Sequence, residues 1–126
     1  MITLASHVCV DPKSSAGSEF SVDVKGQIVA ITIEHVSGQP KHGDDPSGTN
    51  FGSGFNGKWL TLVISDRTQL GTINEDETIM SFSNLNIVSP QEEIFKLYFP
   101  DSDYGDNSGV ACYNVYATLG TKYFLF

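Results

Sequence analysis

The chain has 126 residues, of which 40% are hydrophobic and 17% are charged, so it is long enough for one domain with its own core and too apolar for a disordered protein. Fifteen acidic residues against seven basic ones give a formal charge of −8 at pH 7, which excludes the cationic surface that nucleic-acid binding requires. No apolar run approaches the roughly 20 residues that span a bilayer, so we expect no membrane insertion.

Alternating and β-branched segments predict strands along most of the chain, and Gly-, Pro- and Asp-rich turns separate them. The helix signal is confined to Ser89–Glu92, a capping-box pattern with room for one turn before the next strand pattern. We therefore predict one domain, residues 1–126, folded as an all-β, jelly-roll-like antiparallel sandwich of seven to eight short strands. In chain order, the strand patterns cover residues 2–10, 20–24, 28–36, 59–65, 78–85, 94–99 and 110–119, with a further short candidate at 122–126.

The N-terminal segment does not resemble a signal peptide. It has no basic start, and His7 interrupts its apolar stretch. We expect cytoplasmic synthesis without a signal peptide, with any release following a non-standard route. In that setting Cys9 and Cys112 are expected to be reduced, buried thiols, although one bridge between their strand-like segments stays open.

Two loops hold most of the side chains suited to binding, residues 37–58 and residues 100–109. The second loop contains three carboxylates and one amide. A hard cation such as calcium takes six to eight oxygens from such groups, whereas the alternative is a solvated acidic turn, because the same residue types form turns. An EF-hand is excluded, since position 12 of such a loop would be Cys112 instead of a bidentate Glu. The candidate side-chain ligands are Asp101, Asp103, Asp106 and Asn107.

Other motifs carry weaker signals. Residues 52–57 match G-x-G-x-x-G but precede a strand pattern, so they do not fit a dinucleotide site. His7 and His35 lie in strand patterns and are read as surface or packed residues. His42 lies in the long loop beside acidic residues, where a Ser-His-Asp triad stays open as an alternative to an exposed loop residue. Trp59 is the single tryptophan, and its two possible roles are packing in the core and stacking against a sugar ring.

The segment Asp101 to Gly109, followed by an alternating strand, resembles the calcium- and sugar-binding loop of PA-IL-type galactophilic bacterial lectins. The resemblance implies a small jelly-roll sandwich, made without a signal peptide, that binds galactose through a bridging calcium ion. It places Asp101 as the first carboxylate ligand, Asp103 as a carbonyl donor, and Asp106 and Asn107 as the last two ligands.

A weaker resemblance to the same family extends over residues 20–119. It places Gln39 near a position that supplies a backbone carbonyl to the metal, and His42 and Asp45-Pro46 near the loop that contacts the sugar. Gly71-Thr72-Ile73 resembles a turn in that family.

The sequence also departs from the family pattern. The spacer before Asp103 is shorter by about two residues, and Asp106 stands where an amide is usual. Asp45 replaces the family's histidine before Pro46, and the aromatic C-terminus has no counterpart. Calcium binding is therefore a stronger expectation than galactose specificity.

These observations lead to a first hypothesis, a non-enzymatic calcium-dependent lectin for galactose-type glycans. The expected metal ligands are Gln39, Asp101, Asp103, Asp106 and Asn107. The sugar would contact His42, Asp45 and Pro46 together with Asp101, Asp103, Asp106 and Asn107. Because single sites of this kind bind weakly, we expect a homo-oligomer that presents several of them.

Two alternatives remain at this stage. One is a non-catalytic, partner-binding β-sandwich with a structural calcium site. The other is a small hydrolase.

Overall fold

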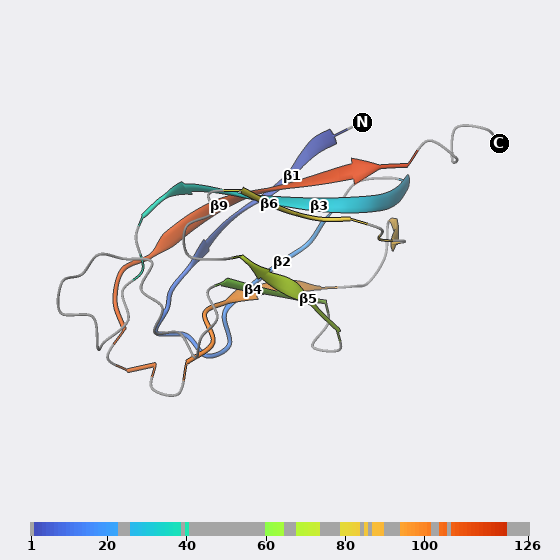
Figure 1. The fold of residues 1–126 in the computed structure, drawn as a ribbon. Helices are drawn as coiled ribbons and strands as arrows, with labels where there is room; N and C mark the ends of the chain where they lie inside the picture. The colour runs from blue at the N-terminus through green and yellow to red at the C-terminus, as the bar shows by residue number, and fades with distance from the viewer. Residues whose placement is uncertain are drawn as a thin grey trace.

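The computed structural model describes residues 2–22, 26–38, 40, 60–64, 68–73, 79–83, 85, 87–89, 94–101, 104–105 and 107–120. All regular structure within these residues consists of β-strands (Figure 1). The described residues contain no helix that is long and apolar enough to cross a membrane. The prediction of an all-β sandwich is confirmed. The strands are β1 (Ile2–Val10), β2 (Ser18–Phe20), β3 (Gly26–Ser37), β4 (Leu60–Ile64), β5 (Thr68–Ile73), β6 (Ile79–Phe82), β7 (Ile87–Ser89), β8 (Phe95–Tyr98) and β9 (Ala111–Leu119).

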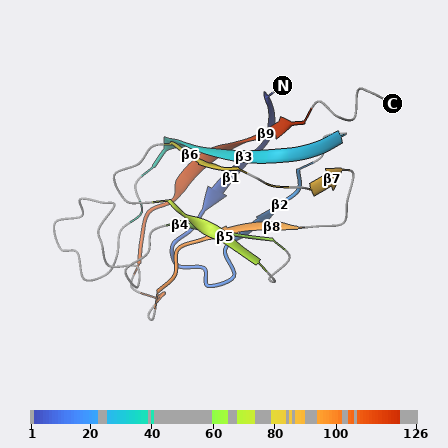
Figure 2. The same cartoon turned by 45° about the vertical axis from the view of Figure 1, so that its right-hand side comes forward.

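The strands form two antiparallel sheets that lie face to face. The first sheet has the order β1-β9-β3-β6, and β7 pairs with the beginning of β3. The second sheet has the order β2-β8-β4-β5. Both views show the two sheets as separate layers, with β8 leading from the second layer into β9 of the first (Figures 1 and 2). The β8–β9 connection therefore crosses between the layers at one end of the sandwich.

The core lies between the sheets. In β8 and β9 it follows the alternation of side chains along the strand, whereas all residues of β4 are buried. In β9, Tyr113 and Val115 are buried, whereas the alternate residues Asn114 and Tyr116 are partly exposed. β8 alternates in the same way from the other sheet. The core cluster consists of Val8, Val10, Phe20, Val22, Ile28, Ile31, Ile33, Leu60, Leu62, Ile64, Phe95, Leu97, Phe99, Ala111, Tyr113, Val115 and Ala117.

The structure contains nine strands among the described residues, against the predicted seven to eight. Gly71–Ile73 belong to β5 and pair with β4, so the expectation of a turn at these residues is wrong. Ser89 ends β7, which pairs with the beginning of β3. Short strands of this kind depend on a partner strand that is distant in sequence, so local alternation does not reveal them. The predicted strand at 122–126 lies outside the described residues.

The two cysteines form a disulfide, with an S–S distance of 2.08 Å. The expectation of two reduced, buried thiols is wrong, since Cys9 is exposed and Cys112 is partly exposed on the outer face of the first sheet. The disulfide forms because the register of β1 and β9 places the two cysteines directly opposite one another, with Cα atoms 4.0 Å apart.

Candidate functional site

The candidate site is the β8–β9 connection, which follows the buried Phe99 and precedes β9. Asp101 and Asn107 of the predicted ligand set are described there, together with Tyr104 and Gly105. Asp103 and Asp106 lie outside the described residues. So do Gln39, His42, Asp45 and Pro46.

Asn107 is the buried anchor of this connection, with 1% of its surface exposed. Its side-chain amide donates one hydrogen bond to the carbonyl of Pro12 (2.9 Å) and one to Oδ2 of Asp101 (2.8 Å). Because Nδ2 carries only two hydrogens, both are committed, and a metal ion would meet Asn107 through Oδ1. The structure thus brings together the two predicted ligands that it describes.

The Pro12 carbonyl is held in place by a tight turn between β1 and β2. Ser14 N–H donates to the carbonyl of Asp11 (3.0 Å), and Lys13 N–H donates to Oδ1 of Asp11 (2.9 Å). An Asp that bonds the backbone two residues on is a common turn device. The Asp11-Pro12 start is a turn signal in the sequence, but the contact of this turn with Asn107 becomes visible only in the structure.

Tyr104 organises the loop between the two candidate ligands. Its hydroxyl accepts a hydrogen bond from the backbone N–H of Asp101 (3.1 Å), and its carbonyl accepts one from the N–H of Asn107 (3.3 Å). Tyr104 therefore spans the loop from its first candidate ligand to its last. Tyr104 lies within the segment that resembles the lectin loop, and the sequence alone indicated no role for its side chain.

Gly38 brings the beginning of the long loop against the end of the β8–β9 connection. Its φ angle is +82°, and a Cβ atom at this position would collide with the carbonyl oxygen of Val110. The ring of His35 supports this strand end, because its Nε2 donates to the carbonyls of Gly38 (2.7 Å) and Ser37 (3.1 Å). The described ends of the two predicted functional loops are therefore neighbours.

The donor set of this site suits a hard cation. A carboxylate and a carboxamide supply oxygen ligands, the type that calcium selects. Burial of Asn107 and its two hydrogen bonds fix that side chain before any ligand arrives. The residues present are compatible with a calcium ion on the grounds of donor chemistry.

No family model matches the sequence, and no curated protein matches it either. The structure is similar to AJLec, a lectin from the sea anemone Anthopleura japonica, with a TM-score of 0.66. The similarity covers 91% of this chain and 93% of that chain, at 13% sequence identity. At this identity the comparison shows a shared β-sandwich fold.

Proposed function

We propose that the protein binds carbohydrate in a calcium-dependent manner, with hydroxyls of a galactose-type glycan completing the metal's coordination. The observation that carries this proposal is the Asp101–Asn107 pair, whose side chains are joined by a 2.8 Å hydrogen bond from Nδ2 of Asn107 to Oδ2 of Asp101 in a loop anchored by the buried amide. The sandwich fold shared with a sea anemone lectin also supports carbohydrate binding.

In the proposed site, Asp101, Asp106 and Asn107 bind calcium through side chains, and Gln39 and Asp103 do so through carbonyls. The bound ion would polarise sugar hydroxyls, which explains how an acidic protein can hold a neutral ligand. The outer side of the sugar would contact His42, Asp45 and Pro46. The proposed role is binding alone, without bond cleavage, and a homo-oligomer would add avidity.

One observation favours a second candidate, a partner-binding sandwich in which the loop has only a structural role. Both N–H groups of the Asn107 amide are bonded within the protein. The loop is therefore tied to the β1–β2 turn without any ligand. In that case calcium, if bound, would stabilise the fold and would not recruit sugar.

The decisive experiment measures galactose binding and thermal unfolding, each with millimolar calcium and with a chelator. The proposed function predicts that galactose binding disappears with the chelator. It also predicts stabilisation by calcium, about 2.7 kcal/mol at a hundredfold excess over Kd. The structural role predicts the stabilisation without galactose binding at any calcium concentration. An unchanged melting curve would contradict calcium binding altogether.

Two substitutions separate the metal from the sugar. Asp101→Asn removes one ligand charge at nearly constant volume and should weaken calcium binding by about tenfold or more. Glu19→Gln on the exposed surface of β2 removes the same charge and serves as the control, with calcium binding retained. His42→Ala should weaken galactose binding while the calcium-induced stabilisation remains. Equal loss of calcium affinity in the His42 and Asp101 variants would contradict these roles.

A further inference from the structure

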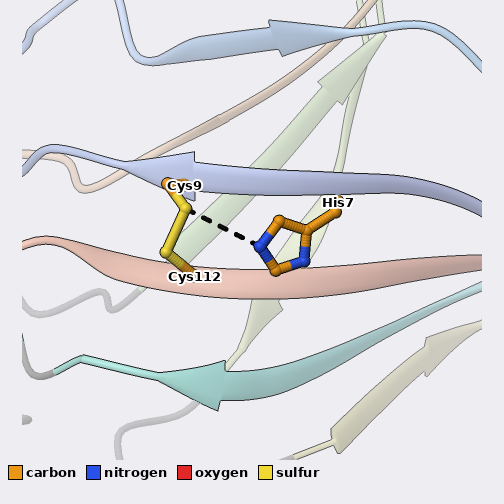
Figure 3. Close-up of side chains that lie close together, drawn as sticks. All are labelled: His7, Cys9 and Cys112. Carbon is orange, nitrogen blue, oxygen red and sulfur yellow. Dashed lines mark hydrogen bonds between the residues drawn. A yellow bond between two sulfur atoms is a disulfide. The ribbon is translucent and has the colours of Figure 1, made fainter.

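A second cluster of potential metal ligands lies on the outer face of the first sheet. His7 and Cys9 project from β1 and Cys112 from β9, and their ligand atoms all lie within 4.8 Å of one another. The His7 Nε2 atom is 3.9 Å from the Cys9 Sγ atom (Figure 3). His7 and Cys9 are exposed, while Val8 between them points into the core. An ion can therefore reach this cluster from solvent.

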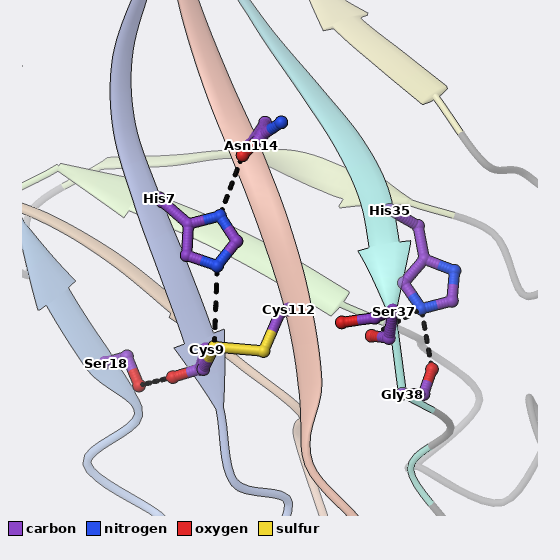
Figure 4. The surroundings of a disulfide bond; sticks show 8 residues. All are labelled: His7, Cys9, Ser18, His35, Ser37, Gly38, Cys112 and Asn114. Carbon is purple, nitrogen blue, oxygen red and sulfur yellow. Dashed lines mark hydrogen bonds between the residues drawn. A yellow bond between two sulfur atoms is a disulfide. The ribbon is translucent and has the colours of Figure 1, made fainter.

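The ring of His7 is already oriented towards the sulfur atoms. Its Nδ1 lies 2.7 Å from Oδ1 of Asn114, the residue opposite it on β9 (Figure 4). Because an amide oxygen only accepts, Nδ1 carries the hydrogen, and in the neutral ring the lone pair of Nε2 faces the sulfurs. Metal-binding histidines are typically held in this way by an acceptor on their other ring nitrogen.

We propose that reduction of the Cys9–Cys112 disulfide converts this cluster into a binding site for a thiophilic metal ion such as Zn²⁺. A phosphine reductant supplies two electrons to the disulfide and is oxidised to the phosphine oxide with an oxygen atom from water. The two protons of that water pass to the sulfurs. The metal then displaces the two thiol protons and binds both thiolates and His7 Nε2, with water in the fourth position. The disulfide state therefore decides whether the site exists.

The surrounding sheet keeps the three ligands together after the disulfide opens. The β1–β9 ladder pairs residues along both strands, from Ile2 opposite Thr118 to Val10 opposite Ala111. The buried side chains of Val8 and Tyr113 hold the two strands on the core beside the cluster. Tetrahedral zinc places sulfur and nitrogen ligands about 3.6 Å apart, close to the separation that His7 and Cys9 already have. Only the two thiolates need to rotate to new positions.

The test uses the full-length protein in excess calcium, so that the acidic loop does not take up the probe ion. Oxidised and phosphine-reduced samples are dialysed against Zn²⁺, and a parallel titration uses Co²⁺, whose thiolate charge-transfer absorption reports sulfur ligation. We expect one ion per chain with sulfur ligation in the reduced protein and none in the oxidised protein. Equal binding by both forms would overturn the proposal, as would the loss of the β-sheet circular dichroism spectrum on reduction.

Variants then assign the ligands. Cys112→Ser should abolish binding to the reduced protein, and His7→Ala should weaken it by at least about tenfold. Asn114→Ala, which releases the ring without removing a ligand, should weaken binding by about 10–100-fold. His35→Ala on β3 is the matched control and should bind like the wild type, because its Nε2 already donates to backbone carbonyls. Wild-type affinity in the His7 variant, or a loss in the His35 variant equal to that of His7→Ala, would overturn the assignment.

Discussion

Tyr113 is a buried core residue whose ring carries a polar hydroxyl. Its side chain is 1% exposed, and within the described part of the chain its hydroxyl has no hydrogen-bond partner. The ring lies 5.3 Å from that of His35. Burial raises the pKa of Tyr113 well above its ordinary value of 10.0, because the phenolate would be poorly solvated there. The ring thus contributes apolar packing, whereas the hydroxyl opposes folding.

Tyr113→Phe is expected to stabilise the protein by about 1 kcal/mol at neutral pH, since it removes a buried hydroxyl that has no partner among the described residues. The substitution should also change the pH dependence of stability above about pH 10. Because the pKa of Tyr113 is higher in the folded than in the unfolded state, the wild type loses about 1.4 kcal/mol of unfolding free energy per pH unit above about pH 10, and the Phe variant lacks this loss. Urea unfolding of both proteins at neutral and alkaline pH measures this. A less stable Phe variant at neutral pH would show that the hydroxyl is bonded.

At the scale of elements, the β8–β9 connection depends on contacts from two other parts of the chain. The β1–β2 turn supplies the Pro12 carbonyl to Asn107, and the end of β3 places Gly38 against Val110. Both contacts join residues that are far apart in the sequence. The geometry of the candidate site is therefore set by how the sheets are assembled as much as by the loop itself.

Gly38→Ala should destabilise the protein by about 1–3 kcal/mol, because a Cβ would combine a strained φ of +82° with a collision against the Val110 carbonyl. Gly26→Ala is the control, since it shares a positive φ (+122°) but among the described residues would meet only the Leu119 side chain, at 3.8 Å. We expect Gly38→Ala to be the less stable of the two in urea unfolding and to lose more calcium-induced stabilisation. Equal effects would mean that backbone strain alone matters at Gly38.

At the scale of the whole molecule, the disulfide joins the first strand to the last described strand, across a sequence separation of 103 residues. It closes nearly the entire chain into one loop. Such a cross-link lowers the conformational entropy of the unfolded state.

The double substitution Cys9→Ser and Cys112→Ser should lower the free energy of unfolding by about 2–4 kcal/mol while leaving a cooperative β-sheet fold. Thermal unfolding followed by circular dichroism measures the loss. The matched comparison is the wild type under oxidising and reducing conditions, where the reduced form should resemble the double variant. Unfolding at the same temperature in all three samples would contradict a stabilising cross-link.

The whole molecule is also predicted to form a homo-oligomer. Exposed Ile2 and Leu4 lie on β1, an edge strand of the first sheet, and the sequence ends in Tyr123–Phe126, four consecutive large apolar residues. Exposed apolar side chains on an edge strand favour an interface between subunits, and we predict that the apolar C-terminal residues take part in it. Deletion of residues 123–126 should shift sedimentation towards the monomer and leave calcium-induced stabilisation intact. A full-length protein that sediments as a 13.7 kDa monomer at micromolar concentration would contradict the homo-oligomer.

The sequence by itself determined the fold class and most of the strands. Alternation in β8 and β9 reflects a local rule, since successive side chains point to opposite faces of a sheet. The β-branched, mostly apolar residues of β3 predict a strand without strict alternation. The pairing of Asp101 with Asn107 was also within reach of the sequence, because only six positions separate them in one loop. Calcium binding, galactose specificity and the formation of a homo-oligomer stay predictions.

Only the tertiary structure decided the contacts between distant segments. The alternation of a strand assigns each side chain to a face but does not name the partner strand or its register. For that reason the sequence left the Cys9–Cys112 pairing open and did not indicate that Pro12 would reach Asn107. The cluster of His7 with the two cysteines arises in the same way, because it exists only in the register in which β1 lies beside β9.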